Sequence, residues 1–215
     1  MQFWVELASE MSREWFAEHK GRYDELWVTP MTALLEGVAR RLAPIYRPYK
    51  LGEPRPLRIY RDLRFSADKT PYKTHIAAVL RLAGKPIAKV GNAAIYIEIG
   101  LDDEYVGGGC WYFDSARLAR WRKAAIGPPG AKLLPILARL RKAGYQVDRD
   151  DDYRRVPKPF APDHPRGELL RRRGLTCGFP AIPGGLLHEP ELADWLFQHA
   201  RATAPLILWL HRYVG

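Results

Sequence analysis

Residues 58–73 read RIYRDLRFSADKTPYK and place five cations, two carboxylates and two tyrosines within sixteen positions. We call this stretch the charged motif. Apolar and polar residues alternate from position 57 to 65, which predicts a strand, because successive strand side chains point to opposite faces. Residues 66–71 carry turn signals and residues 73–82 alternate again, so we expect a β-hairpin here.

Arg61 falls on the apolar face of the first predicted strand, together with Leu57 and Ile59. An arginine keeps its proton, so in apolar surroundings it needs a carboxylate, a phosphate or several carbonyl groups. Arg61 is therefore expected to be either half of an internal ion pair or the floor of an anion site. Arg58, Arg64 and the residues alternating with them fall on the other face, toward solvent or ligand.

Two further strands are predicted downstream of the charged motif. Residues 94–101 alternate so that the isoleucines share one face, while Tyr96 and Glu98 share the other. Residues 105–113 include three consecutive glycines, which weaken a strand unless a bulge or a close neighbour needs the room. Short connections favour an antiparallel meander with one polar, aromatic face.

Helical periodicity flanks the predicted strands on both sides. Before them, residues 3–11 predict one helix, Ser12 is the N-cap of a second, and Gly21 separates that helix from a longer one ending near position 42. After them, helices are expected at residues 115–126, 131–143 and about 190–213, the last kinked at Pro205. We therefore predict an α+β fold in which an antiparallel sheet of about four or more strands, in the middle of the chain, packs against N-terminal and C-terminal helices.

Composition limits the possible classes. A chain of 215 residues with 47% hydrophobic content can bury a full core, and we expect one compact domain over residues 1–215. The apolar runs are short and the N-terminus has no cleavable apolar segment, so we expect no membrane partner and a cytoplasmic location. Cys110 and Cys177 lack metal-ligand spacing, so buried reduced thiols are expected.

The charged motif also resembles a family signature, in the order Arg-x-x-Arg-Asp-x-Arg-Phe-x-x-Asp-Lys-x-x-Tyr over residues 58–72. The family is bacterial and fungal and is catalogued only as a domain of unknown function. Other parts of the family are resembled by residues 12–16 with Tyr23, by the glycines at 107–109 with Trp111, and by residues 157–158, 163–165 and 168–171. This chain has Pro159 where members often carry glycine, which argues against a flexible loop there. The resemblance implies a single compact domain and supplies no activity.

The charged motif and the glycine strand form the candidate site. Guanidinium and ammonium groups bind phosphate or carboxylate, and tyrosines donate hydrogen bonds or stack on rings. Asp62 and Glu98 are the candidate catalytic carboxylates. No metal site is assigned, because five cations in one stretch repel a metal ion, and the sequence leaves the cofactor unknown. The predicted ligand-binding residues are Arg58, Tyr60, Arg61, Arg64, Asp68, Lys69, Tyr72, Lys73, Gly107, Gly108 and Gly109.

The leading hypothesis is a site for a phosphorylated or other anionic small ligand, for binding alone or for catalysis. In a second hypothesis the charged motif is an internal ion-pair network of a structural or protein-interaction domain. In a third, the net charge of +10 supports weak, non-specific nucleic-acid binding through counterion release. The third is not favoured, because the positive charge is spread along the chain. The sequence contains no nucleophile elbow, zincin or Walker motif, so no familiar enzyme class is indicated.

Overall fold

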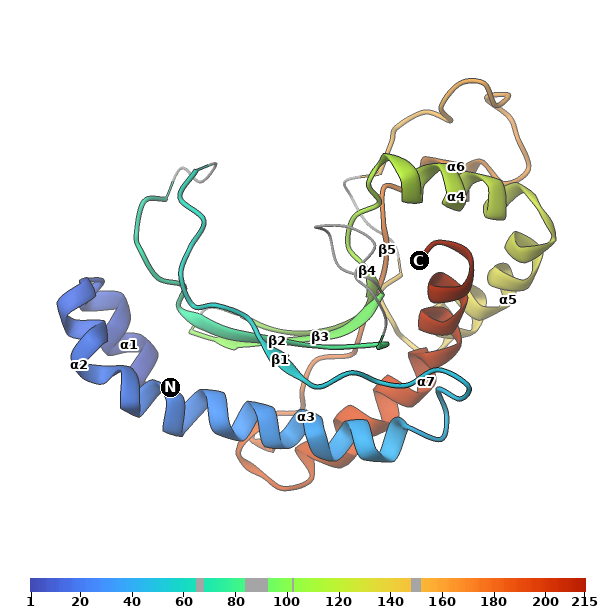
Figure 1. Cartoon of the computed structure of the whole chain (residues 1–215). Coiled ribbons are helices and arrows are strands. Elements are labelled where there is room, and N and C mark those ends of the chain that lie inside the picture. Colours follow the sequence, from blue (N-terminus) through green and yellow to red (C-terminus); the bar gives the residue numbers. More distant parts are fainter. Residues whose placement is uncertain (65–67, 84–92, 102, 148–151) are drawn as a thin grey trace.

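The computed structural model describes residues 1–64, 68–83, 93–101, 103–147 and 152–215. Its centre is a five-stranded antiparallel sheet with the strand order β1-β2-β3-β4-β5 (Figure 1). Helices precede and follow the sheet in the chain, so the predicted α+β fold is confirmed. The strands are β1 (Arg55–Pro56), β2 (His75–Arg81), β3 (Ala94–Gly100), β4 (Glu104–Cys110) and β5 (Leu175–Gly178).

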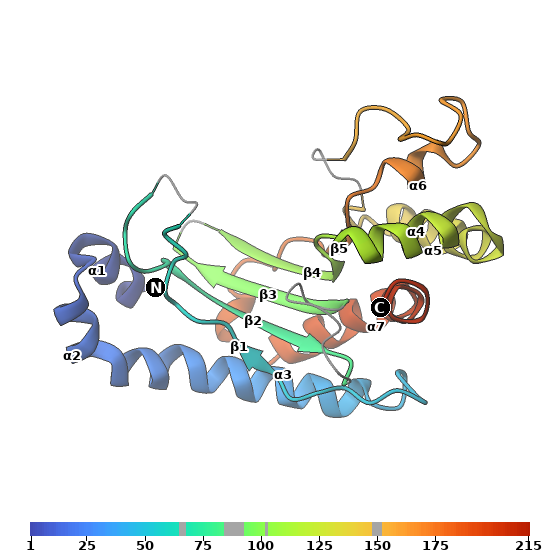
Figure 2. The same ribbon diagram turned by 45° about the horizontal axis from the view of Figure 1, so that its top comes forward.

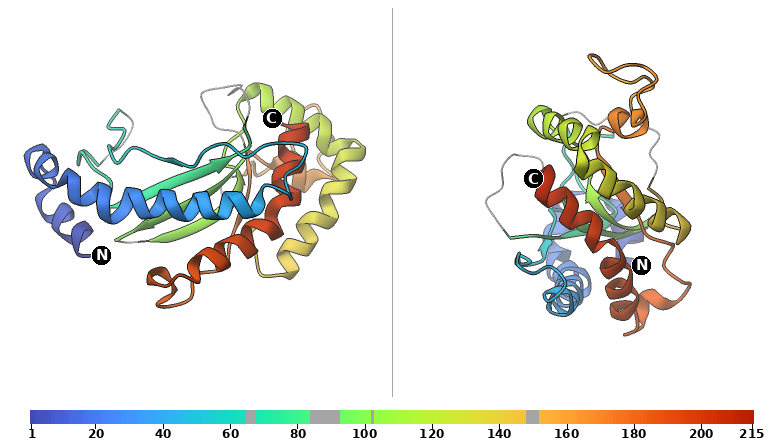
Figure 3. Two further views of the ribbon diagram at one scale, coloured as in Figure 1. Left: turned by 60° about the horizontal axis from the view of Figure 1, so that its bottom comes forward. Right: turned by 90° about the vertical axis from the view of Figure 1, so that its right-hand side faces the viewer.

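The two faces of the sheet differ in what covers them. The register pairs Ala78 with Ile97 and Ile97 with Val106, which gathers apolar side chains on one face. Helices α3 (Thr29–Leu42) and α7 (Leu192–Tyr213) contact each other and lie across this face (Figure 3, left). Among the described residues, no helix crosses the opposite face, which is open in Figure 1. The core therefore lies on one side of the sheet only.

Helix α2 (Arg13–Tyr23) continues through the π-helical segment η1 (Asp24–Val28) into α3 without a break, whereas α1 (Gln2–Glu10) is separated from α2 by Met11 and Ser12. The predicted N-cap is confirmed, because the Ser12 side chain accepts a hydrogen bond from Trp15 N at 3.1 Å. The predicted break at Gly21 is wrong, since α2 runs through it. Pro30 lacks an N–H and crowds the preceding turn, and the wider π turn just before it accommodates the proline without ending the helix.

The C-terminal half adds helices at the far end of the sheet, opposite α1 and α2 (Figure 2). The N-cap of the first of these helices is Asp114, whose side chain accepts from Arg117 N at 2.8 Å. The next helix begins before its predicted start, at a first-turn proline. Strand β5 was not predicted; it returns after a long excursion to pair with β4. These helices are α4 (Ser115–Ile126), α5 (Pro128–Lys142) and α6 (Gly167–Arg171). The short 3₁₀ segment η2 (Leu186–His188) lies instead near α1, since Leu187 and His188 line a hollow together with Gln2 and Phe3.

The charged motif is not a strand, so the predicted hairpin at residues 57–82 is wrong in its first half. β1 ends at Pro56, and after it the described residues of the motif form an isolated bridge between Tyr60 and Tyr72 but no strand. Pro54 and Pro56 cannot donate to a ladder, which limits pairing at this edge. Aspartates further on accept from nearby backbone N–H groups and so favour turns over a strand. Residues 65–67 of the motif lie outside the described residues.

Gly109 gives a test of the β4–β5 register. Its φ is +138°, and a Cβ there would overlap the carbonyl oxygen of Leu175 in β5. We therefore expect Gly109→Ala to lower the free energy of unfolding by at least about 2 kcal/mol in urea denaturation. Gly21→Ala is the control: it lies within α2 with nothing near its Cβ position, so it should raise stability by about 0.5–1 kcal/mol. Small, equal effects of both changes would contradict the register.

Candidate functional site

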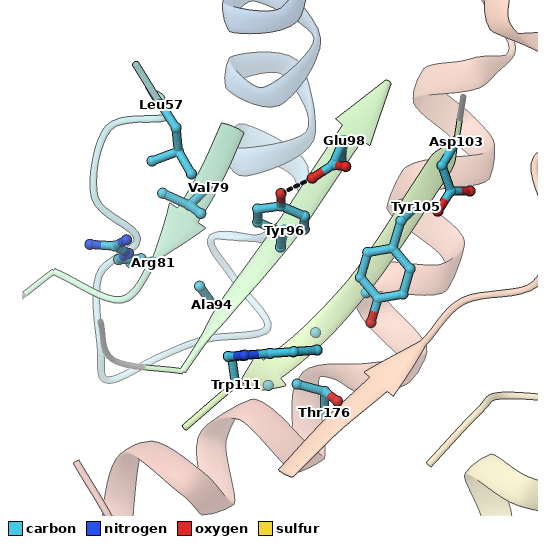
Figure 4. Close-up of a pocket in the computed structure, with 13 residues that line it drawn as sticks. Leu57, Val79, Arg81, Ala94, Tyr96, Glu98, Asp103, Tyr105, Trp111 and Thr176 are labelled. Carbon is cyan, nitrogen blue, oxygen red and sulfur yellow. Dashed lines mark hydrogen bonds between the residues drawn. The ribbon is translucent and has the colours of Figure 1, made fainter. Parts of the chain in front are cut away.

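The open face of the sheet is hollowed into a cavity of about 590 Å³, which we call the sheet cavity (Figure 4). The register explains which side chains line it, because residues paired across antiparallel strands share a face. One row across the sheet runs from Arg81 through Ala94 and Gly109 to Thr176. The next row runs from Val79 through Tyr96 and Gly107 to Gly178, and a third from Ala77 through Glu98 to Tyr105.

One end of the sheet cavity carries a carboxylate held by its neighbours. The Tyr96 hydroxyl donates to Glu98 Oε2, and His75 Nδ1 lies 3.5 Å from Glu98 Oε1. Burial, and then the hydrogen bond to Glu98, raise the pKa of Tyr96, so its hydroxyl keeps its proton and donates. Burial lowers the pKa of Lys73, and the charge of Glu98 partly opposes this effect. Lys73, the last residue of the charged motif, is thus within electrostatic reach of Glu98.

Aromatic side chains form the walls of the sheet cavity. The Tyr96 and Tyr105 rings lie 6.1 Å apart between centroids and are inclined at 48°. Trp111, just beyond β4, lines the cavity although it is 68% exposed. Figure 4 shows Tyr105 and Trp111 on the side of the cavity opposite Arg81. The floor between them carries small residues, so flat apolar surfaces surround an open centre.

Each glycine of residues 107–109 has a different physical role. A Cβ on Gly107 would lie 2.5 Å from the Tyr105 hydroxyl, so its absence lets that ring lie across the strand. Gly108 faces the opposite side, where a Cβ would lie 3.2 Å from Ile207 Cδ1 of α7. Gly109 adopts the backbone conformation that other residues avoid. All three line the sheet cavity and also meet a packing need, so their occurrence does not by itself indicate a ligand.

The other end of the sheet cavity is basic. Arg55 pairs with Val79 across the sheet, so Arg55 and Arg81 share the open face. Arg81 and Leu57 also line a second hollow of about 500 Å³ between β1 and α2, which we call the edge groove. In Figure 4 the Arg81 guanidinium points away from Tyr96, toward that edge. Burial, and then the charge of Arg55, lower the pKa of Arg81.

Arg81 lacks a partner within the described part of the chain. Its Nε is buried there without a hydrogen bond, and neither Arg55 nor Arg81 makes an ion pair with a described carboxylate. Arg81 is half-buried, and the two fully buried arginines of the described residues are each paired with a carboxylate: Arg117 lies 3.3 Å from an Asp114 oxygen, and Arg172, whose Nε also lacks a hydrogen bond, lies 3.0 Å from Glu168. The basic end therefore differs from the arginine sites that hold the fold together.

The charges of the motif, by contrast, pair mostly with one another. Asp62 accepts from Arg64 Nε at 3.0 Å and Nη2 at 2.8 Å, and Arg58 lies 3.8 Å from the same carboxylate. These hydrogen bonds hold the pKa of Asp62 far below its usual range. Arg61 lies 3.3 Å from Asp68, and its Nε donates to the Tyr72 carbonyl at 3.3 Å. Three of the five cations of the motif thus share its two carboxylates, and the motif keeps a net charge of +3 (five cations less two carboxylates).

Tyr72 attaches the charged motif to the N-terminal helices. Its ring is buried and lies 4.5 Å from the Phe16 ring of α2 and 5.2 Å from the Tyr60 ring. Tyr60 is half exposed and lines the edge groove. Asp68 accepts from Thr70 N at 2.9 Å, and Lys69 donates to the Leu63 carbonyl at 2.8 Å. These local contacts close the loop over the edge of the sheet.

A family model described as "Conserved hypothetical protein (DUF2461)" matches residues 1–209. The chain belongs to this family. The predicted resemblance to a family of unknown function is therefore confirmed. No curated protein and no solved structure matched the chain. Since the family description names no activity, the function of this DUF2461 chain has to be argued from its own site.

The structure separates the predicted site residues of the DUF2461 chain into three groups. The sheet cavity brings together Glu98 and residues 107–109, and the edge groove includes Arg58 and Tyr60. The remaining predicted residues line neither hollow and hold the motif loop instead: Arg61, Asp62, Arg64, Asp68, Lys69, Tyr72 and Lys73. Their assignment as ligand-binding or catalytic residues stays a prediction.

Sequence reasoning missed several residues that line these hollows. Arg81 alternates with Val79 in the predicted second strand, so its place on the polar face could have been found from the pattern. Arg55, Tyr105 and Trp111 depend on cross-strand neighbours that a single strand does not reveal. In the described part of the chain, no three His, Cys, Asp or Glu side chains are close enough to hold a metal ion. None of the described helices is both long and apolar enough to cross a membrane.

Arg61 was predicted to lie in the interior with a carboxylate partner. Its partner is the carboxylate of Asp68, but the Arg61 side chain is 28% exposed and lies at the periphery. We expect Arg61→Ala to lower the free energy of unfolding by about 1–2 kcal/mol, because a charged hydrogen bond and an ion pair are lost. Arg64→Ala, at a side chain 74% exposed, should cost less than about 1 kcal/mol. Equal urea midpoints for the two variants would contradict a stabilising role of the Arg61 contacts.

Proposed function

We propose that this DUF2461 protein binds a small anionic ligand on the open face of its sheet, with the anionic group held by Arg55 and Arg81. The observation that carries the proposal is the Arg81 guanidinium, whose Nε is buried without a partner within the described residues. A cation removed from water is costly unless an opposite charge or hydrogen-bond acceptors compensate it. A bound phosphate or carboxylate supplies both.

The neighbouring charges strengthen this argument. Arg55 and Arg81 share one face of adjacent strands, and like charges in that arrangement repel each other. An anion between them would turn the repulsion into two attractions. Arginine is suited to this task, because its planar fork binds two oxygens of a phosphate or carboxylate at once. Arg58 and Tyr60 line the same edge groove and can add a charge and a hydroxyl group.

The proposed anion site therefore lies beside the charged motif rather than along its whole length. Of the five cations in the motif, Arg58 is the one that lines the edge groove. Its contact with Asp62 is long, at 3.8 Å, whereas Arg64 forms two short hydrogen bonds with that carboxylate. A carboxylate already bound twice by an arginine is a poor general base, so we propose binding and assign Asp62 no catalytic step.

A structural role for the rest of the motif is the second candidate function. Its support is the set of contacts that join Arg61 to Asp68 and stack Tyr72 on Phe16 of α2. In this role the motif fixes the loop that borders the edge groove, and so it serves the anion site indirectly. Weak nucleic-acid binding through the net charge of +10 stays a prediction from composition.

Arg81→Met tests the anion site. We expect it to weaken the binding of inorganic pyrophosphate at least about tenfold in calorimetry at low ionic strength, because a charge-assisted hydrogen-bond pair is lost. The melting temperature without ligand should not fall, since the removed cation has no described partner.

Arg155→Met is the matched control, with the same change of net charge at an exposed position outside both hollows. It should leave the pyrophosphate affinity nearly unchanged. Equal affinities of the two variants would show that pyrophosphate responds only to overall charge, which contradicts the proposal. Citrate, titrated in parallel, distinguishes carboxylate from phosphate ligands.

A further inference from the structure

We propose that the ligand held at Arg55 and Arg81 is of the nucleotide class: an anionic group joined to a flat aromatic ring that bears amino groups and lies in the sheet cavity. This inference rests on the proposed anion site and adds the other half of the ligand. The sheet cavity and the edge groove are adjacent, because Leu57 and Arg81 line both of them. A ligand anchored at the basic end therefore has a path into the sheet cavity.

The floor of the sheet cavity suits a flat ring. Ala94 and Gly109 are paired neighbours in the row that begins at Arg81, and Gly107 follows in the adjacent row. None of these side chains rises above the strands by more than a methyl group, so a shallow, level area remains at the centre of the sheet. A volume of about 590 Å³ is within the usual range for small-molecule sites.

The walls supply aromatic surface for such a ring. Tyr96 and Tyr105 border the level area, and Trp111 extends over it from the end of β4 (Figure 4). Trp111 is 68% exposed, an unusual state for the largest apolar side chain. Its neighbour Tyr112 is 43% exposed but does not line the cavity. A stacked ring would cover the Trp111 surface that water now contacts.

The polar groups beyond the ring area are hydrogen-bond acceptors. A carboxylate has about four lone-pair sites; on Glu98 the Tyr96 hydroxyl occupies one at Oε2, and His75 Nδ1 lies 3.5 Å from Oε1, so acceptor sites remain for a ligand. Glu98 and Asp103 both line the cavity, with Asp103 at the same end as Glu98 (Figure 4). Acceptors of this kind select rings that carry N–H donors, such as the exocyclic amino group of adenine.

The two ends are too far apart for a bare anion to use both. Arg81 pairs with Ala94, and Glu98 lies four residues further along β3, which is roughly 13 Å at the rise of a strand. Apolar surface from Leu57 and Val79 lies between the arginines and the aromatic walls. A ligand that contacts both ends therefore needs an anionic group, a linking portion and a ring.

The test compares AMP, UMP, adenosine and pyrophosphate by calorimetry with the full chain at low ionic strength. AMP should bind at least about tenfold more tightly than either adenosine or pyrophosphate, since each of those two carries only one of the two groups that the site binds. Trp111→Ala should weaken the binding of AMP about tenfold and leave the affinity for pyrophosphate unchanged. Tyr112→Ala, the matched control next to it, should change neither. Glu98→Gln keeps an acceptor for Tyr96 but should remove the preference of AMP over UMP.

The outcomes separate this inference from the proposed function. If pyrophosphate binds through Arg81 but AMP binds no more tightly, and Trp111→Ala has no effect, the nucleotide inference is overturned and the anion site stands. If adenosine binds as tightly as AMP and pyrophosphate does not bind, the anion site is overturned, and with it the combined ligand. Circular dichroism of each variant confirms that the fold is retained.

Discussion

The close contact between α7 and the sheet is the packing constraint on which the rest of the structure depends. Gly108 lies in β4 with Ile207 of α7 directly over it, and a Cβ there would lie 3.2 Å from Ile207 Cδ1. Helix α3 lies beside α7 and contacts β2, so the two helices together cover the face of the sheet that carries the isoleucines. With its apolar residues buried on that side, the sheet can leave its other face open, and both hollows lie there or at its edge.

The stretch of this protein with the most charged residues is not the one whose charges are most available to a ligand. The charged motif has the greatest density of cations, yet its three arginines already pair with Asp62 and Asp68 within the same loop. Arg55 and Arg81 come from two different strands, and no described carboxylate pairs with either. A charge that is already paired gains little from a ligand, because the ligand must first displace the partner. The unpaired arginines therefore have more binding energy to offer than the denser motif.

Positive and negative side chains lie at opposite ends of the open face. Arginines lie at the β1 edge, Tyr96 lies between, and carboxylates lie toward the turn that connects β3 and β4. Glu98 is oriented by Tyr96 and His75, so this end is held in place by its own contacts. Separated opposite charges with aromatic surface between them favour a ligand whose own groups are arranged in the same order. This arrangement is the physical basis of both proposals.

The sequence by itself determined the features that depend on local chemistry. Ser12 and Asp114 cap helices through hydrogen bonds to residues three positions away, and the alternating isoleucines of β3 specify a strand with one buried face. The same local reasoning failed for the charged motif, where aspartate side chains bind the backbone and compete with strand pairing.

Only the tertiary structure decided which distant residues meet. β5 is four residues long and pairs with β4 from more than sixty positions away, so no short pattern in residues 175–178 could indicate it. The pairing of Arg55 with Val79 places two arginines on one face, and the pairing of Tyr96 with Gly107 leaves the floor of the sheet cavity open. Register is a non-local property. The sequence of one strand decides which of its side chains share a face, but the pairing with another strand decides which residues lie beside them.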